Sequence, residues 1–265
     1  MSQDLFSLDG YTAIVTGASG LIGQKHCEAL HNAGATVVAC DLRLDDERWS
    51  SDRYLGIEAN VTDKAALESV RDQVIEKTGR IDVLVNNAAI NDMFESPALA
   101  AKQSMFENYP VDMWQRSLDV NVTGVFLCSQ VFGTVMAEAG SGSIINVAST
   151  YGMVGPDQSI YVDENGTRTM YKSPAYPSTK GAVLNFTRFL AAYWGHKGVR
   201  VNTLSPGGVQ NGQDDWFVHN YSAKTCLGRM AQSDDYQGAI VFLASEASRY
   251  MTGANLIVDG GWTAI

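Results

Sequence analysis

The sequence predicts an α/β fold in which a parallel β-sheet carries helices on both of its faces. Short apolar runs typical of buried strands alternate along the whole chain with segments whose apolar residues recur at helical spacing. The chain has 265 residues, which is enough for one large core. Because no Pro/Ser-rich linker, shift in composition or internal repeat divides it, we expect a single domain over residues 1–265.

The first half of the chain predicts four strands and three helices. Glycines that suit the end of a helix follow two of the helical segments, at Gly34 and Gly79, and the pair Thr62-Asp63 suits a helix start. We expect strands over 11–16, 36–40, 54–59 and 81–87, and helices over 21–33, 62–79 and 110–139.

The second half continues the alternation, with strands expected over 142–149, 199–205 and 254–259 and helices over 177–197 and 234–245. Three aromatic-rich stretches, 90–109, 150–175 and 207–230, fit neither pattern, and each follows a predicted strand. Loops after the carboxyl ends of parallel strands build the ligand crevice of such a sheet. We therefore expect these three stretches, called the substrate loops below, to converge over a bound substrate.

Composition and charge exclude several classes of protein. With 45% hydrophobic and 18% charged residues, the chain is typical of globular proteins. Nineteen Lys and Arg against 29 Asp and Glu give a net charge of −10, so no general attraction to nucleic acid or an anionic membrane is expected, although a local pocket for a phosphorylated substrate stays open. The amino terminus lacks a signal-peptide pattern and no apolar run approaches ~18 residues, which favours a cytoplasmic location.

Cysteines and histidines indicate neither a disulfide framework nor a metal site. None of the four cysteines lies in a CxxC pair, so we expect reduced thiols. The histidines form no ligand motif, and His26 and His31 are five positions apart, off one helical face. We expect no metal.

The first strand–helix junction, TGASGLIG over 16–23, predicts a dinucleotide site. Glycines at 17, 20 and 23 permit a tight turn, close backbone approach and close helix packing, and the helix start offers N–H groups to a pyrophosphate. Asp41 follows at the end of the second strand, where a carboxylate binds the ribose hydroxyls and repels a 2′-phosphate. This favours NAD over NADP, although the nearby Arg43 could accommodate the phosphate.

A second group of residues suits proton transfer. Tyr176 and Lys180 lie four positions apart on a predicted helix and so share one face. A neighbouring ammonium favours the phenolate form of a tyrosine, which is otherwise a poor base at neutral pH. Taken alone, the pair also fits surface decoration, and Ser149 at the end of the fifth strand also fits a cap or turn.

Taken together, these groups make the chain similar to the short-chain dehydrogenase/reductase family over essentially its whole length. The matching motifs, in chain order, are TGASGLIG (16–23), NNAA (86–89), Asn121 in DVNVTG, Ser149 in NVAS, Tyr176 and Lys180 in YPSTK, SPGG (205–208) and VDGG (258–261). The resemblance implies a Rossmann-type, doubly wound parallel sheet and a homodimer or homotetramer in which the helix segment 184–194 lies at the interface.

The resemblance also implies roles for four catalytic residues. Tyr176 would be the acid/base, and Ser149 would hydrogen-bond the substrate oxygen. Lys180 would bind the nicotinamide ribose and lower the pKa of Tyr176, and Asn121 would hold a water in the proton path. The junction and the resemblance together assign these cofactor-binding residues: Gly17, Ser19, Gly20, Leu21, Ile22, Gly23, Asp41, Asn60, Val61, Asn87, Ala88, Ala89, Tyr176, Lys180, Pro206, Gly207 and Val209.

The chain departs from the family pattern in ways that bear on its substrate. Leu21 stands where the single-domain branch has its middle glycine, and the resulting spacing resembles the extended branch of epimerases and dehydratases. Ser149 and Tyr176 are 27 positions apart, more than is usual for the family. The enlarged loops, the GLIG junction and the VDGGW ending together look similar to relatives that act on sugars in bacterial surface-glycan and nonulosonate pathways. Arg168 and Lys172 are the expected charged helpers.

The sequence thus predicts an NAD-dependent oxidoreductase that interconverts a secondary alcohol and a ketone, on a sugar, sugar phosphate or polyol-like substrate. Two alternatives stay open. The glycine spacing also suits a sugar-nucleotide epimerase or dehydratase, and a Rossmann fold alone also suits a catalytically silent NAD-binding regulator.

Overall fold

A computed structural model describes residues 4–44, 53–91 and 97–265, and the account below concerns these residues. Seven parallel strands form one sheet in the order β3-β2-β1-β4-β5-β6-β7. Their bounds are β1 Thr12–Thr16, β2 Thr36–Asp41, β3 Tyr54–Glu58, β4 Val83–Asn86, β5 Gly142–Val147, β6 Val199–Pro206 and β7 Asn255–Val258. The predicted doubly wound sheet is confirmed.

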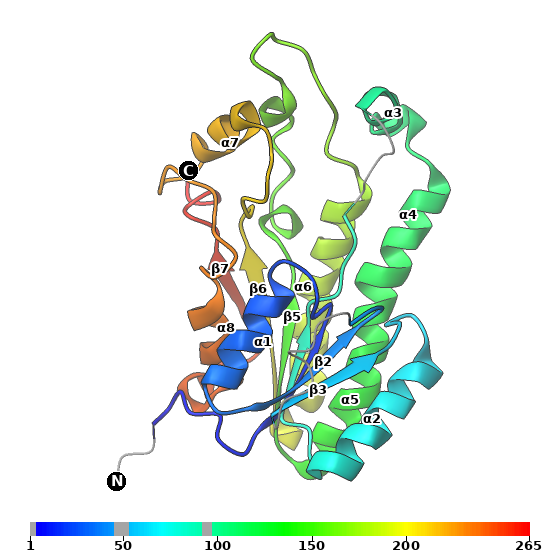
Figure 1. The fold of residues 1–265 in the computed structure, drawn as a ribbon, viewed down its shortest axis with the longest axis vertical. Coiled ribbons are helices and arrows are strands. Elements are labelled where there is room, and N and C mark those ends of the chain that lie inside the picture. The colour runs from blue at the N-terminus through cyan, green and yellow to red at the C-terminus, as the bar shows by residue number, and fades with distance from the viewer. Residues whose placement is uncertain (1–3, 45–52, 92–96) are drawn as a thin grey trace.

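Helices cover both faces of the sheet (Figure 1). On one face, α1 (Gly23–Asn32) packs beside α8 (Gln237–Ala244). On the other face lie α2 (Lys64–Thr78), α5 (Val125–Ala139) and α6 (Ala175–Trp194). Because each face is covered, strand residues are buried on both sides: Ile14 belongs to the core under α2, α5 and α6, and its neighbour Val15 to the core under α1 and α8.

The expected helix over 110–139 is continuous but not regular. It consists of α4 (Val111–Leu118), a π-helical segment (Asp119–Gly124) and α5. The whole run Val111–Ala139 is long and apolar enough to cross a membrane, but 56% of its most apolar window is buried inside the molecule. Since α5 packs on β4 and β5 and against α2, this run is a core helix.

Other parts of the expected pattern also differ in the structure. Two short helices, α3 (Pro97–Gln103) and α7 (Asp215–Ser222), lie in stretches that had no predicted element. Helix α6 begins at Ala175 rather than at 177, since a proline is tolerated in the first turn of a helix. As a result, Tyr176 and Lys180 both lie on its first turns. Strand β5 ends at Val147, so Ser149 lies just beyond the strand.

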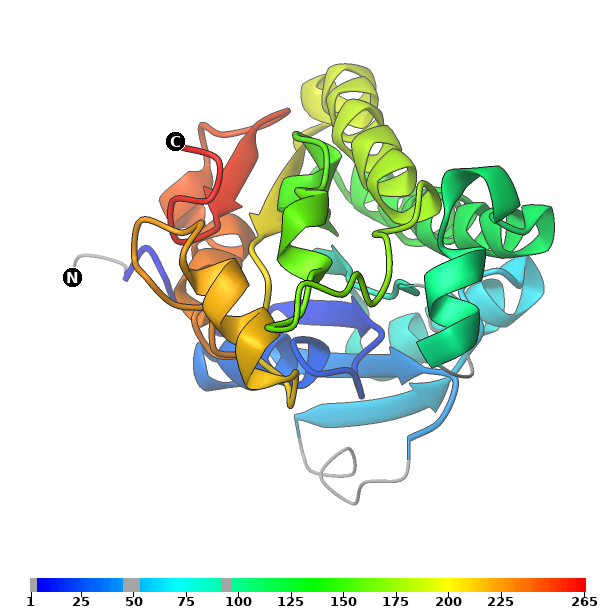
Figure 2. The same ribbon diagram turned by 90° about the horizontal axis from the view of Figure 1, so that it is seen from above.

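The strand order places a switch point between β1 and β4. From β1 the chain builds outward through β2 and β3, and from β4 it builds in the opposite direction through β5, β6 and β7. Ligands of such sheets bind at the carboxyl ends of the strands beside this point. Viewed from above, the 150–175 segment, α7 and α4 lie around this end of the sheet (Figure 2).

Candidate active site

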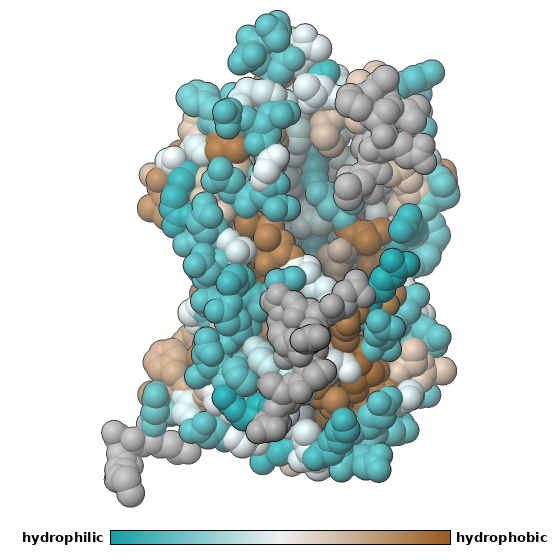
Figure 3. Space-filling model, in the orientation of Figure 1, coloured by the Kyte–Doolittle hydropathy of each residue, from teal (hydrophilic) through white to brown (hydrophobic). Residues whose placement is uncertain are grey.

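A cleft of about 1040 Å³ opens at the carboxyl ends of the strands. Figure 3 shows a recess in the upper half of this face of the molecule. All of the predicted cofactor-binding residues, from Gly17 to Val209, line this cleft. So do three of the four predicted catalytic residues, Ser149, Tyr176 and Lys180.

The glycine turn after β1 packs so closely against neighbouring backbone that side chains would not fit there. Gly17 has a φ of +65°, and a Cβ there would lie 2.8 Å from the Cα of Ala88. A Cβ at Gly23 would collide with the Gly17 carbonyl oxygen. Helix α1 then begins without a side-chain cap, and although the Gln24 N–H donates to the Gly20 carbonyl at 3.0 Å, a helix start of this kind can still donate neighbouring N–H groups to a ligand. These features fit a dinucleotide pyrophosphate.

The β2 end of the cleft carries a fixed carboxylate. Asp41 accepts hydrogen bonds from the backbone N–H groups of Ser19 (2.9 Å) and Leu42 (2.7 Å), which hold it beside the glycine turn. The Arg43 side chain is exposed, and Arg43 is not one of the described residues that line the cleft. The arrangement fits the predicted ribose contact of Asp41.

Thr16, which the sequence did not single out, ties the glycine turn to the segment after β4. Its hydroxyl accepts hydrogen bonds from the backbone N–H groups of Asn87 and Ala88, both at 3.1 Å. In return, the Asn87 side chain donates to the carbonyls of Thr16 (3.0 Å) and Gly17 (2.9 Å). The signal that could have found Thr16 is a hydroxyl directly before the first glycine of the turn.

Ser149, Tyr176 and Lys180 meet in the floor of the cleft. Ser149 is buried and caps a short 3-10 turn, Thr150–Gly152, where its hydroxyl accepts from the Tyr151 N–H. Lys180 reaches under Tyr176: its Nζ donates to the Val147 carbonyl at 2.7 Å and lies 5.6 Å from the centre of the Tyr176 ring.

Burial sets the acid–base character of this group. It raises the pKa of Tyr176, and a hydrogen bond with Ser149 opposes that rise. It also lowers the pKa of Lys180 to about 8. The Lys180 ammonium is bonded to the Val147 carbonyl, and its predicted lowering of the pKa of Tyr176 stays a prediction.

Asn121 lies behind the cleft wall instead of lining it. It is fully buried in the π-helical segment, where its side chain accepts from the Ile90 N–H at 2.8 Å and donates to the Ile90 carbonyl at 2.9 Å. It also donates to the Thr179 hydroxyl at 3.1 Å. Asn121 therefore links the segment after β4 to α6. Its predicted role in holding a water stays a prediction.

Described parts of all three substrate loops line the cleft, and residues 92–96 of the first loop lie outside the described residues. Their lining residues include Asn91 from the first loop, Tyr151 and Tyr161 from the second, and Phe217 and Tyr221 from the third. The carboxyl-terminal Trp262 stacks on the Tyr221 ring with a centroid distance of 4.3 Å, and together these side chains form a small core of their own. The aromatic residues thus both wall the cleft and hold the loops together.

Of the two predicted charged helpers, only Lys172 reaches the cleft. The guanidinium of Arg168 donates to the Gln158 carbonyl at 2.6 Å and lies 4.6 Å over the Tyr171 ring, so it binds the loop itself. The expectation for Arg168 is therefore wrong. The guanidinium of Arg168 is held by its contacts with Gln158 and Tyr171 and does not face the cleft.

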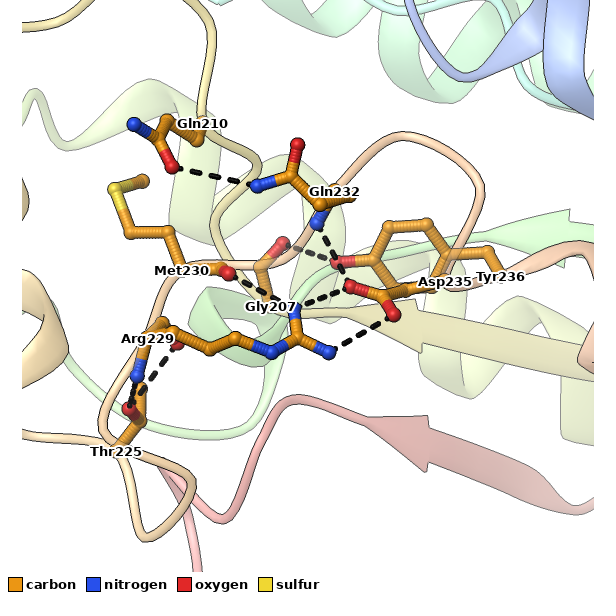
Figure 4. Close-up of polar contacts among 8 residues, drawn as sticks. All are labelled: Gly207, Gln210, Thr225, Arg229, Met230, Gln232, Asp235 and Tyr236. Atoms are coloured by element: carbon orange, nitrogen blue, oxygen red, sulfur yellow. Dashed lines mark hydrogen bonds and ion pairs between the residues drawn. The ribbon is translucent and has the colours of Figure 1, made fainter.

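A polar network anchors the returning end of the third substrate loop (Figure 4). Arg229 forms an ion pair with Asp235 at 2.6 Å and donates to the Met230 carbonyl at 3.0 Å. Tyr236 donates to the carbonyl of Gly207 at 3.1 Å. Since Gly207 and Met230 both line the cleft, the network fixes one wall of the site from outside.

Further lining residues carried no signal in the sequence. Gln213 lies in the third loop, and Arg116 and Asp119 lie near the end of α4. In the described part of the chain, no group of three or more His, Cys, Asp or Glu side chains is placed to hold a metal ion. The site therefore consists of a dinucleotide cradle joined to a Ser–Tyr–Lys group under aromatic loops.

Comparison with known proteins identifies the family. A family model of short-chain dehydrogenases, described as enoyl-(acyl carrier protein) reductase, matches residues 17–263. The chain belongs to the short-chain dehydrogenase/reductase family. As a short-chain dehydrogenase, it is an oxidoreductase that acts on CH–OH groups.

Its relatives among short-chain dehydrogenases include enzymes named for polyols and sugar acids. The chain is 35% identical to the D-threitol dehydrogenase of Mycolicibacterium smegmatis, over 97% of this chain and 95% of that protein. A gluconate 5-dehydrogenase from Burkholderia cenocepacia, solved with NADP and tartrate, matches 99% of this chain and 98% of its own with a TM-score of 0.84 and 29% identity. A short-chain dehydrogenase from Leptospira borgpetersenii with bound NAD+ matches 99% and 97% with a TM-score of 0.87 and 30% identity.

Proposed function

We propose that this short-chain dehydrogenase uses NAD to interconvert a secondary alcohol and a ketone on a sugar, sugar phosphate or polyol-like substrate. The observation that carries the proposal is the meeting of Ser149, Tyr176 and Lys180 with the glycine turn in one cleft. The names of the relatives support a polyhydroxylated substrate. The phenol rings of the substrate loops suit the apolar C–H faces of such a molecule.

In this mechanism Tyr176 moves the proton. Ser149 hydrogen-bonds the substrate oxygen and Tyr176, and so aligns the hydroxyl with the phenol. The phenolate of Tyr176 removes the hydroxyl proton when the alcohol is oxidised, and the phenol returns it when the ketone is reduced. Lys180 lies beneath the phenol and would bind the cofactor ribose. NAD, when bound, supplies the acceptor for a hydride.

The proposal is tested by incubating the protein with NAD and a panel of sugars, sugar phosphates and polyols, and by following NADH absorbance. Label carried by NADH at nicotinamide C4 separates the alternatives. We expect the label in the released alcohol. Its return to the cofactor during turnover would indicate an epimerase, and the absence of turnover with any member of the panel would favour a silent NAD-binding regulator.

We expect the wild-type protein to prefer NAD over NADP by more than ~10-fold in kcat/KM, because the Asp41 carboxylate repels a 2′-phosphate. Asp41→Ala should erode this preference. Arg43→Ala serves as the control and should preserve the preference, since the Arg43 side chain does not line the cleft. Equal kcat/KM values for the two cofactors in the wild type would contradict the assignment.

We expect Ser149→Ala to lower kcat/KM for alcohol oxidation by about 10²-fold at neutral pH, because one preorganised donor is lost. The hydrogen bond with Ser149 lowers the pKa of Tyr176, so its loss should also move the rising limb of the pH–rate profile to higher pH. Ser173→Ala is the matched control, because the buried Ser173 hydroxyl has no hydrogen-bond partner among the described residues. An unmoved limb in Ser149→Ala would exclude this role.

We propose that the protein forms a homodimer or homotetramer through α6. Phe189 and Tyr193 are each 59% exposed on this helix, and their rings stack in a row with a centroid distance of 5.8 Å. A row of exposed aromatic rings suits a buried interface. We expect a dimeric or tetrameric mass by light scattering at micromolar concentration, and a shift toward monomer for Phe189→Glu. A monomeric mass for the wild type would rule the assembly out.

A further inference from the structure

Tyr221, on helix α7 of the third substrate loop, is a phenol fixed in the wall of the cleft. It lines the cleft although only 4% of its surface is exposed. Its ring stacks on Trp262 with a centroid distance of 4.3 Å and an angle of 25°, and it lies 6.2 Å from the Phe217 ring. Gly208 leaves room for the phenol, since a Cβ there would lie 2.6 Å from the Cζ atom of Tyr221. Contacts with the carboxyl terminus, α7 and the segment after β6 therefore hold the ring.

The phenol oxygen of Tyr221 lies between two other residues that line the cleft. It accepts a hydrogen bond from the backbone N–H of Gly208 at 2.5 Å, and it is hydrogen-bonded to the Thr150 side chain. Both partners adjoin the assigned site in the sequence, because Thr150 follows Ser149 and Gly208 follows Gly207, which is predicted to bind the cofactor. The hydroxyl groups of Tyr221 and Thr150, called the hydroxyl pair below, therefore lie beside the reacting end of the cleft.

The hydroxyl pair keeps one proton to donate. The hydrogen bond between Tyr221 and Thr150 uses the proton of one hydroxyl, whichever way it runs. The Gly208 N–H occupies a lone pair of the phenol oxygen and accepts no proton. Within the described parts of the chain, neither hydroxyl has another acceptor. Burial raises the pKa of Tyr221 to about 12, so the phenol stays protonated at neutral pH. Buried hydroxyls normally have partners, and a ligand in the cleft can supply the missing acceptor.

From this arrangement we propose that the hydroxyl pair of Tyr221 and Thr150 binds a second oxygen of the substrate, and so selects polyhydroxylated substrates over simple secondary alcohols. A buried donor that is left without an acceptor destabilises the complex, so a substrate that lacks the second oxygen should react less well by about 10- to 100-fold. The proposal deepens the proposed function and rests on it, because the pair would act on the same alcohols that Tyr176 deprotonates.

The test compares polyols with analogues that lack a single hydroxyl. The probes are D-threitol and D-glucitol, each with all of its monodeoxy analogues, and kcat/KM for oxidation is measured at saturating NAD. The product of each reaction identifies the hydroxyl that is oxidised. In the wild type, we expect the loss of one particular other hydroxyl to lower kcat/KM by more than ~10-fold. That hydroxyl is the one that the pair would bind.

The double variant Tyr221→Phe/Thr150→Val removes both hydroxyls and keeps the aromatic ring and the branched side chain. In this variant the loss of the same substrate hydroxyl should lower kcat/KM by less than about 3-fold, because the group that binds it is gone. Tyr236→Phe is the matched control. It removes a hydroxyl that donates to the Gly207 carbonyl at 3.1 Å from outside the cleft (Figure 4), so the full wild-type penalty should remain.

A penalty that persists in the double variant, or that falls equally in Tyr236→Phe, would overturn the role of the hydroxyl pair. A fluorescence titration with NADH reports whether each variant is folded, and Tyr221→Phe alone makes the same comparison if the double variant is not. A wild type that oxidises the polyols but tolerates the loss of every other hydroxyl would refute the hydroxyl pair alone. A wild type that oxidises neither polyol would refute the proposed substrate class as well.

Discussion

Tyr176→Phe is expected to lower kcat/KM for alcohol oxidation by about 10²–10⁴-fold while NAD affinity stays close to that of the wild type. The substitution removes only the phenol oxygen, which is the atom that the proposed mechanism uses to take up and return the proton. The ring, whose centre lies 4.6 Å from the Lys172 Nζ and 5.6 Å from the Lys180 Nζ, keeps its packing. Initial rates and a fluorescence titration with NADH measure the two effects separately.

The matched control for this variant lies on the same helix. Tyr193→Phe removes a phenol oxygen from the exposed row on α6, outside the cleft, and should retain wild-type kcat/KM. Activity of Tyr176→Phe within ~10-fold of the wild type would contradict the assigned acid/base role, because general acid–base catalysis contributes more than that. A parallel loss of NADH affinity would indicate that the ring, rather than its hydroxyl, supports the site.

The parts of the site that the sequence predicted are those specified by neighbours in the chain. The glycine turn is local, since Gly17 and Gly23 face each other across a single strand–helix junction. Tyr176 and Lys180 share a helix face, so their spacing alone brings them together. Both groups were placed in one cleft because parallel strands direct their carboxyl ends to the same edge.

The parts that were missed depend on contacts between distant segments. Arg168 and Lys172 have the same charge and lie in the same loop, yet Gln158 binds the guanidinium of one and the backbone of the other. No pattern in the sequence indicates which of them turns inward. The sequence likewise does not show that the amide of Asn121 in the π-helical segment bonds to Ile90 behind the cleft wall, while the catalytic role predicted for Asn121 stays a prediction. Which of these side chains faces the cleft depends on tertiary packing, and the spacing of residues in the sequence does not reveal it.

His26 is a further residue whose environment residue spacing does not predict, since it was considered only as part of an absent metal motif. The structure buries it completely in α1, and neither ring nitrogen has a hydrogen-bond partner among the described residues. Burial lowers its pKa to about 4. Protonation of an imidazole in this position destabilises the folded chain, since an unpaired buried charge is costly.

This burial should make folding stability fall as the pH decreases from about 6.5 toward 4. The unfolded chain binds a proton at His26 near its ordinary pKa of ~6.5, whereas the folded chain resists it until about 4, so the unfolded state gains protons first. The stability that the neutral imidazole permits is therefore complete above ~6.5 and is lost below it. The difference corresponds to about 3 kcal/mol in the free energy of unfolding.

We expect His26→Met to remove this dependence, so that the difference in unfolding free energy between the variant and the wild type grows by about 2–3 kcal/mol between pH 7.5 and pH 4.5 in urea titrations. Carboxylates that titrate in this range act on both proteins alike and cancel in the difference. His196→Met, which removes an exposed imidazole, is the control and should leave the acid limb of the wild type in place. A difference between His26→Met and the wild type that is constant with pH would show that His26 is protonated in the folded state, and that its environment supplies a partner for the charge.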